Sequence, residues 1–274
     1  TNIFCYDGTM NIHDVSLNAS TSNNVRITDG TINMKKVEVG GNSQKSNTSH
    51  HGIYMEGGTI NAEDVTIKMT TGSGIRNKGG VFKGKNIVMH DINRVAVSQG
   101  KHDYLKVEGL TEINGLEIQS TNYANVWNEG GGTVKITNAK FAVAASNSVR
   151  VNDGLVELTN VTIPGHKEGL KNNIHGIYME GGELVAQNMT ISNTAGNGIR
   201  NKNVGKNITI NNVKGDTAIA NLPLDEEHKD GIIDIDTITI RDSFSKNVTL
   251  DSGVTTLRNA TLGKAGGNNI KMQS

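Results

Sequence analysis

The sequence predicts an all-β chain wound as a single parallel β-helix of about eleven coils. A short apolar strand signal recurs at a spacing of about 22 residues along the 274-residue chain. Glycine or asparagine follows most of these signals, at the point where each coil needs a corner. A segment that begins at His51 also recurs almost unchanged at His175, which indicates a tandem duplication of the pattern.

The composition favours strands over helices. The chain contains 33 Gly, 2 Pro and 1 Cys, and it is rich in Asn, which forms helices poorly. Runs such as Val-Arg-Ile and Val-Glu-Val alternate apolar and polar residues, as half-buried strands do. Lys and Arg number 27 and so do Asp and Glu, which argues against a nucleic-acid partner. No apolar run is long enough for a transmembrane helix, and the lone Cys5 excludes an internal disulfide.

The duplication relates two halves of the chain. The octapeptide HGIYMEGG begins at His51 and again at His175, about 124 residues later. The remaining matches follow the same offset, apart from a small deletion that we place near Val204. We therefore expect one β-helical domain over residues 1–274, with internal repeats over roughly 22–145 and 146–270.

Each coil is marked by a branched apolar residue, usually five positions before a glycine. Twelve such anchors define about eleven coils, and at about 4.8 Å per coil the rod is on the order of 50 Å long. Insertions over 40–50, 100–108, 164–174 and 221–230 are expected to project as loops. The anchors are Ile3, Val25, Ile53, Ile75, Val97, Val126, Val149, Ile177, Ile199, Ile219, Val248 and Ile270.

The residue after each anchor is expected to point outward, because strand side chains alternate. Arg, Tyr and Trp dominate this row, and they are the residue types most frequent among interface hot spots. An ordinary ladder of stacked side chains is the alternative interpretation. We also expect opposite charges to pair between coils, with Glu56 over Lys78 and Glu180 over Lys202. The predicted partner-binding residues are Arg26, Tyr54, Arg76, Trp127, Arg150, Tyr178, Arg200 and the loop residues Lys45, Lys167 and Lys171.

A polysaccharide-cleaving enzyme is the main alternative to a binding protein. Thr28-Asp29-Gly30, His51-Gly52 and Arg76-Asn77-Lys78 are similar to the elements that β-helical pectinases use. Glycoside hydrolysis needs two carboxyl groups across one bond, however, and the chain has no Asp-Asp pair. The same elements recur in the second repeat, beginning at Asp153. The repeat period places them at corners, where a structural role explains them. We therefore expect no catalytic activity, and no His or Cys spacing indicates a metal or another cofactor.

The glycosylation sequons point to a bacterial source. Asn160-Val161-Thr162 and Asn188-Met189-Thr190 fall at corners, where glycans would crowd neighbouring coils. A eukaryotic secretory origin would place several glycans along one edge of the rod. An exported bacterial protein explains the same sequons as products of the repeat.

The Gly-Gly-Thr-apolar-Asn and Asn-x-Thr-apolar coils resemble passenger domains of bacterial autotransporters (type V secretion) over the whole chain. The duplicated HGIYMEGG and GIRNK segments are most similar to the pro-angiogenic BafA-type passengers. The resemblance implies a right-handed β-helix that is displayed on the outer membrane or released outside the cell. It also implies a signal peptide and a C-terminal outer-membrane β-barrel that this sequence lacks, so we expect membrane contact only through that barrel.

The resemblance further implies a virulence factor whose partner is a host cell-surface receptor. For BafA-type passengers that partner is a vascular endothelial growth factor (VEGF) receptor on endothelial cells, and its activation promotes angiogenesis. A plain adhesin is the alternative within the same family. No binding residue of the family can be carried over, so the expected contact residues come from the stacking argument alone.

Overall fold

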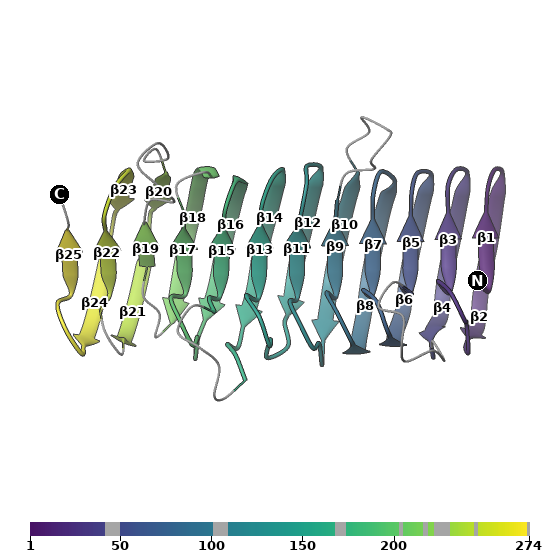
Figure 1. The fold of residues 1–274 in the computed structure, drawn as a ribbon, viewed down its shortest axis with the longest axis horizontal. Coiled ribbons are helices and arrows are strands. Elements are labelled where there is room, and N and C mark those ends of the chain that lie inside the picture. Colours follow the sequence, from purple (N-terminus) through teal and green to yellow (C-terminus); the bar gives the residue numbers. More distant parts are fainter. Residues whose placement is uncertain are drawn as a thin grey trace.

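The computed structural model is an all-β rod in which the chain runs from one end to the other (Figure 1). In the described part of the chain, no helix is long and apolar enough to cross a membrane. The backbone alone is described for residues 205–215 and 241–243. The structure describes residues 1–41, 50–100, 109–167, 174–202, 205–215, 219–221, 231–243 and 246–272.

One side of the rod is a sheet of 12 parallel strands, in which each strand pairs with the short strand of the next coil. Each of the twelve predicted anchors begins one of these strands, so the predicted period is confirmed. The strands are β1 (Ile3–Cys5), β3 (Val25–Ile27), β5 (Ile53–Met55), β7 (Ile75–Asn77), β9 (Val97–Gln99), β11 (Val126–Asn128), β13 (Val149–Val151), β15 (Ile177–Met179), β17 (Ile199–Asn201), β19 (Ile219–Asn221), β22 (Val248–Leu250) and β25 (Ile270–Met272).

The other side is a sheet of 13 parallel strands, most of them longer. Each coil thus consists of one short strand, a tight corner, one long strand and a second corner. The parallel β-helix predicted from the repeat is therefore confirmed. The strands are β2 (Thr9–Leu17), β4 (Thr31–Gly40), β6 (Thr59–Thr70), β8 (Val81–Ile92), β10 (Leu110–Ile118), β12 (Thr133–Lys140), β14 (Leu155–Ile163), β16 (Gly182–Ile191), β18 (Gly205–Gly215), β20 (Ile232–Ile235), β21 (Ile238–Ser243), β23 (Val254–Leu257) and β24 (Ala260–Ala265).

The core lies between the two sheets. The anchors Ile53, Ile75 and Ile177 are fully buried, and Phe82 and Phe141 are the largest fully buried side chains among the described residues. Burying a side chain of this size stabilises the fold by about 1.5–3 kcal/mol relative to leaving it exposed. Because each coil packs on its neighbours, this term repeats along the rod.

The long strands bend at a stack of residues with left-handed backbone. Asn86, Asn138, Asn160 and Asn188 have φ values of 54°, 57°, 55° and 54°. Asn tolerates this conformation better than most residues. The side-chain amide of Asn188 donates to Asn160 Oδ1 at 3.0 Å, and that of Asn160 donates to Asn138 Oδ1 at 2.9 Å. The amides that sequons at Asn160 and Asn188 would glycosylate are thus bonded to neighbouring coils.

The register corrects the predicted position of the deletion. Met89 pairs with Ile67 and Gly215 with Ile191, so Met89 and Gly215 occupy equivalent places in the two repeats. Seven residues follow Met89 before β9, but only three follow Gly215 before β19. The shortening therefore falls between β18 and β19 and not near Val204. Sequence matching misplaced it because β18 keeps few identical residues.

Candidate functional site

The strands that carry the predicted outward row lie next to one another in the 12-stranded sheet, from β1 to β17 (Figure 1). The register pairs Arg26 with Tyr54, Tyr54 with Arg76, and Trp127 with Arg150, as the period predicted. Sequence analysis left out Phe4, which pairs with Arg26. We call this row the arginine–aromatic stripe; its members are Phe4, Arg26, Tyr54, Arg76, Ser98, Trp127, Arg150, Tyr178 and Arg200.

Arg26 is held in place by two rings and a carboxylate. Its guanidinium carbon lies 5.5 Å from the centroid of Phe4 and 5.8 Å from the centroid of Tyr54. Its Nε and Nη2 donate to Glu56 Oε2 at 3.0 and 2.7 Å. Each exposed cation–π contact is worth about 0.5–1 kcal/mol. The side chain is therefore ordered before any partner binds.

The second repeat builds the same stack around Arg150. Its guanidinium carbon lies 4.7 Å from the centroid of Trp127 and 5.9 Å from that of Tyr178. Its Nη2 donates to Glu180 Oε2 at 2.6 Å. Tyr178 is only 9% exposed and donates to Glu180 Oε1 at 3.2 Å, so it supports Arg150 more than it faces solvent.

Glu180 also lies 3.7 Å from the ammonium nitrogen of Lys202, in the pairing that the sequence predicted. The guanidinium of Arg150, on the preceding coil, is much closer to the same carboxylate. The predicted pair of Glu180 and Lys202 is thus present, but Arg150, one coil earlier, is the closer partner of Glu180. The sequence argument missed that partner because it compared only residues at the same offset from the anchor.

Arg76 reaches across two coils. Its Nη2 donates to Glu129 Oε2 at 3.0 Å and its Nη1 donates to the other carboxylate oxygen, Oε1. Ser98, on the coil between them, accepts from Arg76 Nη1 and donates to Glu129 Oε1 at 3.1 Å. Two parallel N–H···O bonds fix the orientation of the guanidinium as well as its position.

Each repeat places a histidine beside a stripe tyrosine; His51 is half-buried and His175 is buried. The rings of His51 and Tyr54 lie 5.5 Å apart at an interplanar angle of 12°, and those of His175 and Tyr178 lie 5.5 Å apart at 16°. Nδ1 of His51 accepts a hydrogen bond from the backbone N–H of Ser73 at 2.9 Å. That bond assigns the ring proton of neutral His51 to Nε2.

Burial keeps both histidines neutral. The loss of solvation, reinforced by the charge of Arg76, lowers the pKa of His51 to about 3. Burial and the charge of Arg200 lower the pKa of His175 to about 3 as well. Neither ring carries a charge at neutral pH, so each acts as a flat support for its tyrosine.

A hollow of about 440 Å³ opens on the stripe in the N-terminal repeat. It brings together four of the side chains predicted from the sequence with others that lie beside them. We call it the N-terminal hollow. It is lined by Asn23, Arg26, His51, Tyr54, Glu56, Ser73, Arg76, Lys78, Arg94, Val95, Trp127 and Glu129.

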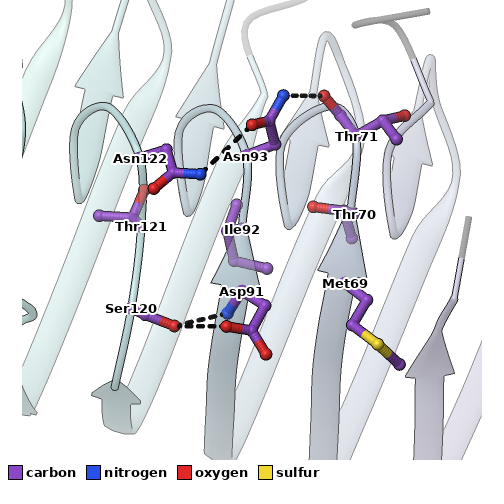
Figure 2. Close-up of a pocket in the computed structure, with 9 residues that line it drawn as sticks. All are labelled: Met69, Thr70, Thr71, Asp91, Ile92, Asn93, Ser120, Thr121 and Asn122. Atoms are coloured by element: carbon purple, nitrogen blue, oxygen red, sulfur yellow. Dashed lines mark hydrogen bonds between the residues drawn. The ribbon is translucent and has the colours of Figure 1, made fainter. Parts of the chain in front are cut away.

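A second hollow, of about 490 Å³, lies at the corner beyond the ends of β6, β8 and β10 (Figure 2). Its amides bond to one another: Asn122 donates to Asn93 Oδ1 at 3.3 Å, and Asn93 donates to the Thr71 carbonyl at 3.2 Å. Ser120 likewise donates to Asp91 Oδ1 at 3.2 Å. These contacts join successive coils, so the polar groups of this hollow have a structural use.

The predicted loop lysines do not extend the stripe in the described structure. Lys45 and Lys171 lie outside the described residues. Lys167 is exposed, and its ammonium lies 3.4 Å from Asn122 Oδ1, at the corner of Figure 2.

The pectinase-like aspartates stand at tight corners. Asp29 Oδ1 accepts a hydrogen bond from the N–H of Gly30 at 2.7 Å, and Asp153 Oδ1 accepts from Gly154 at 2.8 Å. Side chains that close such turns are common at positions of this kind. Among the described residues, no group of three or more His, Cys, Asp or Glu side chains is placed to hold a metal ion.

Sequence reasoning missed Glu129 and Arg94. Glu129 lies two residues after Trp127, at the same offset as Glu56 from Tyr54, so the period could have revealed it. Arg94 lies in the corner between β8 and β9 that the second repeat shortens, and no repeat signal marks it.

Comparisons with known proteins add little. No protein-family model matches the chain, and no curated protein does. Among solved structures, the surface protein and adhesin PfbA of Streptococcus pneumoniae matches at 12% identity and a TM-score of 0.26. That match covers 99% of this chain and 90% of the other. At this TM-score the two chains do not superpose, so the match decides neither fold nor function.

Proposed function

We propose that this chain is a noncatalytic, surface-displayed or secreted bacterial protein that binds host cells through the arginine–aromatic stripe. The N-terminal hollow carries the proposal, because it exposes Arg, Tyr and Trp side chains that are already fixed by coil-to-coil contacts. Residues of these types dominate binding energy at protein interfaces. Side chains that are ordered in advance lose less conformational entropy on binding.

The resemblance to BafA-type passengers supports a narrower form of the proposal. In that form the chain is a virulence factor that binds and activates a VEGF receptor on endothelial cells and promotes angiogenesis. An adhesin that binds cells without activating a receptor is the other form. Receptor phosphorylation on endothelial cells separates the two, because only the agonist raises it.

An agonist must bring two receptors together. Tyr54 and Tyr178 lie five strands apart in the sheet, which is about 24 Å at 4.8 Å per strand. The second repeat lacks several residues of the N-terminal hollow, such as Trp127, whose place Thr249 takes, so we expect one receptor per monomer and activation through a dimer. Light scattering on the purified complex tests this, and a complex of one monomer with two receptors would contradict it.

Cell binding tests the stripe directly. Replacing Tyr54 and Trp127 together by Ala should weaken binding to endothelial cells at least tenfold, since truncated hot spots cost 2 kcal/mol or more in typical interfaces. The far-ultraviolet spectrum of the variant should keep its β signal. Unchanged binding by a folded variant would remove the stripe from the proposal.

The proposal that the chain is not an enzyme has a separate test. Incubation with pectin, chitin and host glycans should release no fragments. Cleavage that disappears in the double variant Asp29→Asn, Asp153→Asn would replace the proposal with a polysaccharide-degrading hydrolase or lyase.

A further inference from the structure

The N-terminal hollow carries more positive than negative charge. Arg26, Arg76, Lys78 and Arg94 line it, against the carboxylates of Glu56 and Glu129. His51 is neutral there at neutral pH, because its pKa is about 3. A concave site with this imbalance attracts an anionic group.

The carboxylates are already occupied, and so are two of the cations. Glu56 holds Arg26 at 2.7 Å, and Glu129 holds Arg76 through both oxygens. Arg94 is exposed, and within the described part of the chain its guanidinium makes no hydrogen bond and no ion pair. Its five N–H donors therefore face the hollow and solvent with their bonding capacity unused.

The rings of the hollow favour a charged peptide group over a sugar. The Tyr54 ring has the guanidinium of Arg26 at 5.8 Å and the ring of His51 at 5.5 Å. The Trp127 ring has the guanidinium of Arg150 at 4.7 Å and its N–H donates to Asn152 Oδ1 at 2.7 Å. These contacts leave a sugar less ring face to stack on, whereas a carboxylate needs only the N–H donors at the rim.

We propose that the N-terminal hollow binds an acidic side chain of a protein partner, that Arg94 is its principal contact, and that the C-terminal repeat has no equivalent site. The proposal rests on the proposed function and names the chemistry of the partner. A guanidinium and a carboxylate form two parallel hydrogen bonds, which fixes the direction of approach as well as the charge.

The C-terminal repeat lacks what the site needs. Thr249 and Ala220 each follow an anchor directly, and they pair with each other as Trp127 and Ser98 do. Thr249 therefore stands in the place of Trp127, and Ala220 in the place of Ser98. Asp251 stands where Glu129 does, two residues after the equivalent of Trp127. Counted from the equivalent residues Met89 and Gly215, the stretch before the next short strand, which contains Arg94 in the first repeat, is four residues shorter in the second. The second repeat keeps the counterparts of the other charged and aromatic lining residues, namely Arg150, His175, Tyr178, Glu180, Arg200 and Lys202.

The single tryptophan of the chain lines the hollow, so its fluorescence reports on binding there. The titrant is a decapeptide of glutamate, and a decapeptide of glutamine is the neutral control. At low ionic strength we expect a saturable change of Trp127 emission with the glutamate peptide only. The variant Arg94→Gln should weaken that binding on the order of tenfold, as loss of a charged hydrogen-bond donor does.

The matched control is Lys140→Gln, which removes an exposed cation from the other sheet. It should leave the titration unchanged. Equal weakening by both variants, or no response of Trp127 to the glutamate peptide, would overturn the proposal. A heparin oligosaccharide that binds through Arg94 while the glutamate peptide does not would overturn it in favour of an anionic glycan. Because the titration uses no cells, its failure leaves cell binding through the stripe to be judged separately.

Discussion

The two repeats of the rod build the same scaffold and then different sites on it. Arg26 and Arg150 each bond to a glutamate on the next coil, at 2.7 and 2.6 Å. The histidine and tyrosine rings beside them stack at 5.5 Å in both repeats. Everything within these coils that supports an outward arginine is thus conserved between the halves of one chain.

The difference begins one coil later. In the N-terminal repeat, Arg76 bonds to Glu129 through both carboxylate oxygens. Its counterpart Arg200 reaches only the Nε2 atom of His175, at 3.4 Å, and the Nε atom of Arg200 and the Oδ1 atom of Asp251 have no hydrogen-bond partner within the described residues. Identical strands therefore do not make identical sites, because the coils stacked beyond them supply the other half.

The largest predicted effect tests whether the scaffold is equal in the two repeats. Ile53→Ala and Ile177→Ala remove equivalent, fully buried side chains. Each should lower the free energy of unfolding by about 2–5 kcal/mol, the usual cost of such a truncation. Denaturant unfolding followed by circular dichroism measures both. A much larger cost at one position than at the other would mean that the two halves are packed differently.

The lowered pKa values of His51 and His175 predict a shared sensitivity to acid. Both pKa values are about 3 in the folded chain, well below the ordinary value of 6.5. Below pH 6.5 the unfolded chain gains protons that the folded chain does not, so stability is unchanged above pH 6.5 and falls from there towards pH 3. The slope is at most about 1.4 kcal/mol per pH unit for each histidine.

Unfolding measured between pH 7 and pH 4 checks this slope. His51→Asn and His175→Asn should each reduce it by a similar amount, because the pKa values of the two rings are lowered to the same extent. A slope that neither substitution changes would show that other groups cause the acid sensitivity.

The pair of Arg76 and Glu129 should be more strongly coupled than its counterpart in the second repeat. A double-mutant cycle on Arg76 and Glu129, with both replaced by Ala, should give a coupling of about 1–2 kcal/mol, because the pair is bidentate and partly buried. The cycle on Arg200 and Asp251 should give about zero. Adding Ala220→Ser and Asp251→Glu together should raise the second coupling towards the first. Equal couplings in the unaltered chain would contradict the asymmetry that we describe.

The left-handed corner predicts the smallest effect, and it should again be equal in the two repeats. Asn86 and Asn160 have φ values of 54° and 55°. Val and Gly both remove the side-chain hydrogen bonds of these residues, but Val should cost about 1–2 kcal/mol more than Gly, since branched residues avoid this conformation. Thermal unfolding of the four variants measures this. Val tolerated as well as Gly at either site would argue against the left-handed corner there.

The fold could be read from the sequence because a solenoid converts linear spacing into contacts. Each anchor, from Ile3 to Ile270, begins a short strand at the predicted place. The row of outward residues followed directly, since strand side chains alternate. Ser98 and Tyr178 show the limit of that rule, because both occupy outward positions and are nevertheless covered by the long side chains stacked on them.

The site itself was only half predictable. Contacts between residues at the same distance from their anchors, such as Arg26 with Tyr54, can be predicted from the repeat period. Diagonal contacts cannot, because Arg76 reaches Glu129 across two coils and 53 residues along the sequence. Arg94 belongs to a corner that breaks the repeat, so no pattern points to it.

The most direct test of the central claim is the binding of the single variant Trp127→Thr to endothelial cells. Trp127→Thr gives the N-terminal repeat the residue that its counterpart has at Thr249. We predict at least tenfold weaker binding by this variant and unchanged binding by Thr249→Ala, with the β spectrum intact in both. Full binding by Trp127→Thr, or an equal loss in Thr249→Ala, would contradict the assignment of the contact surface to the N-terminal hollow.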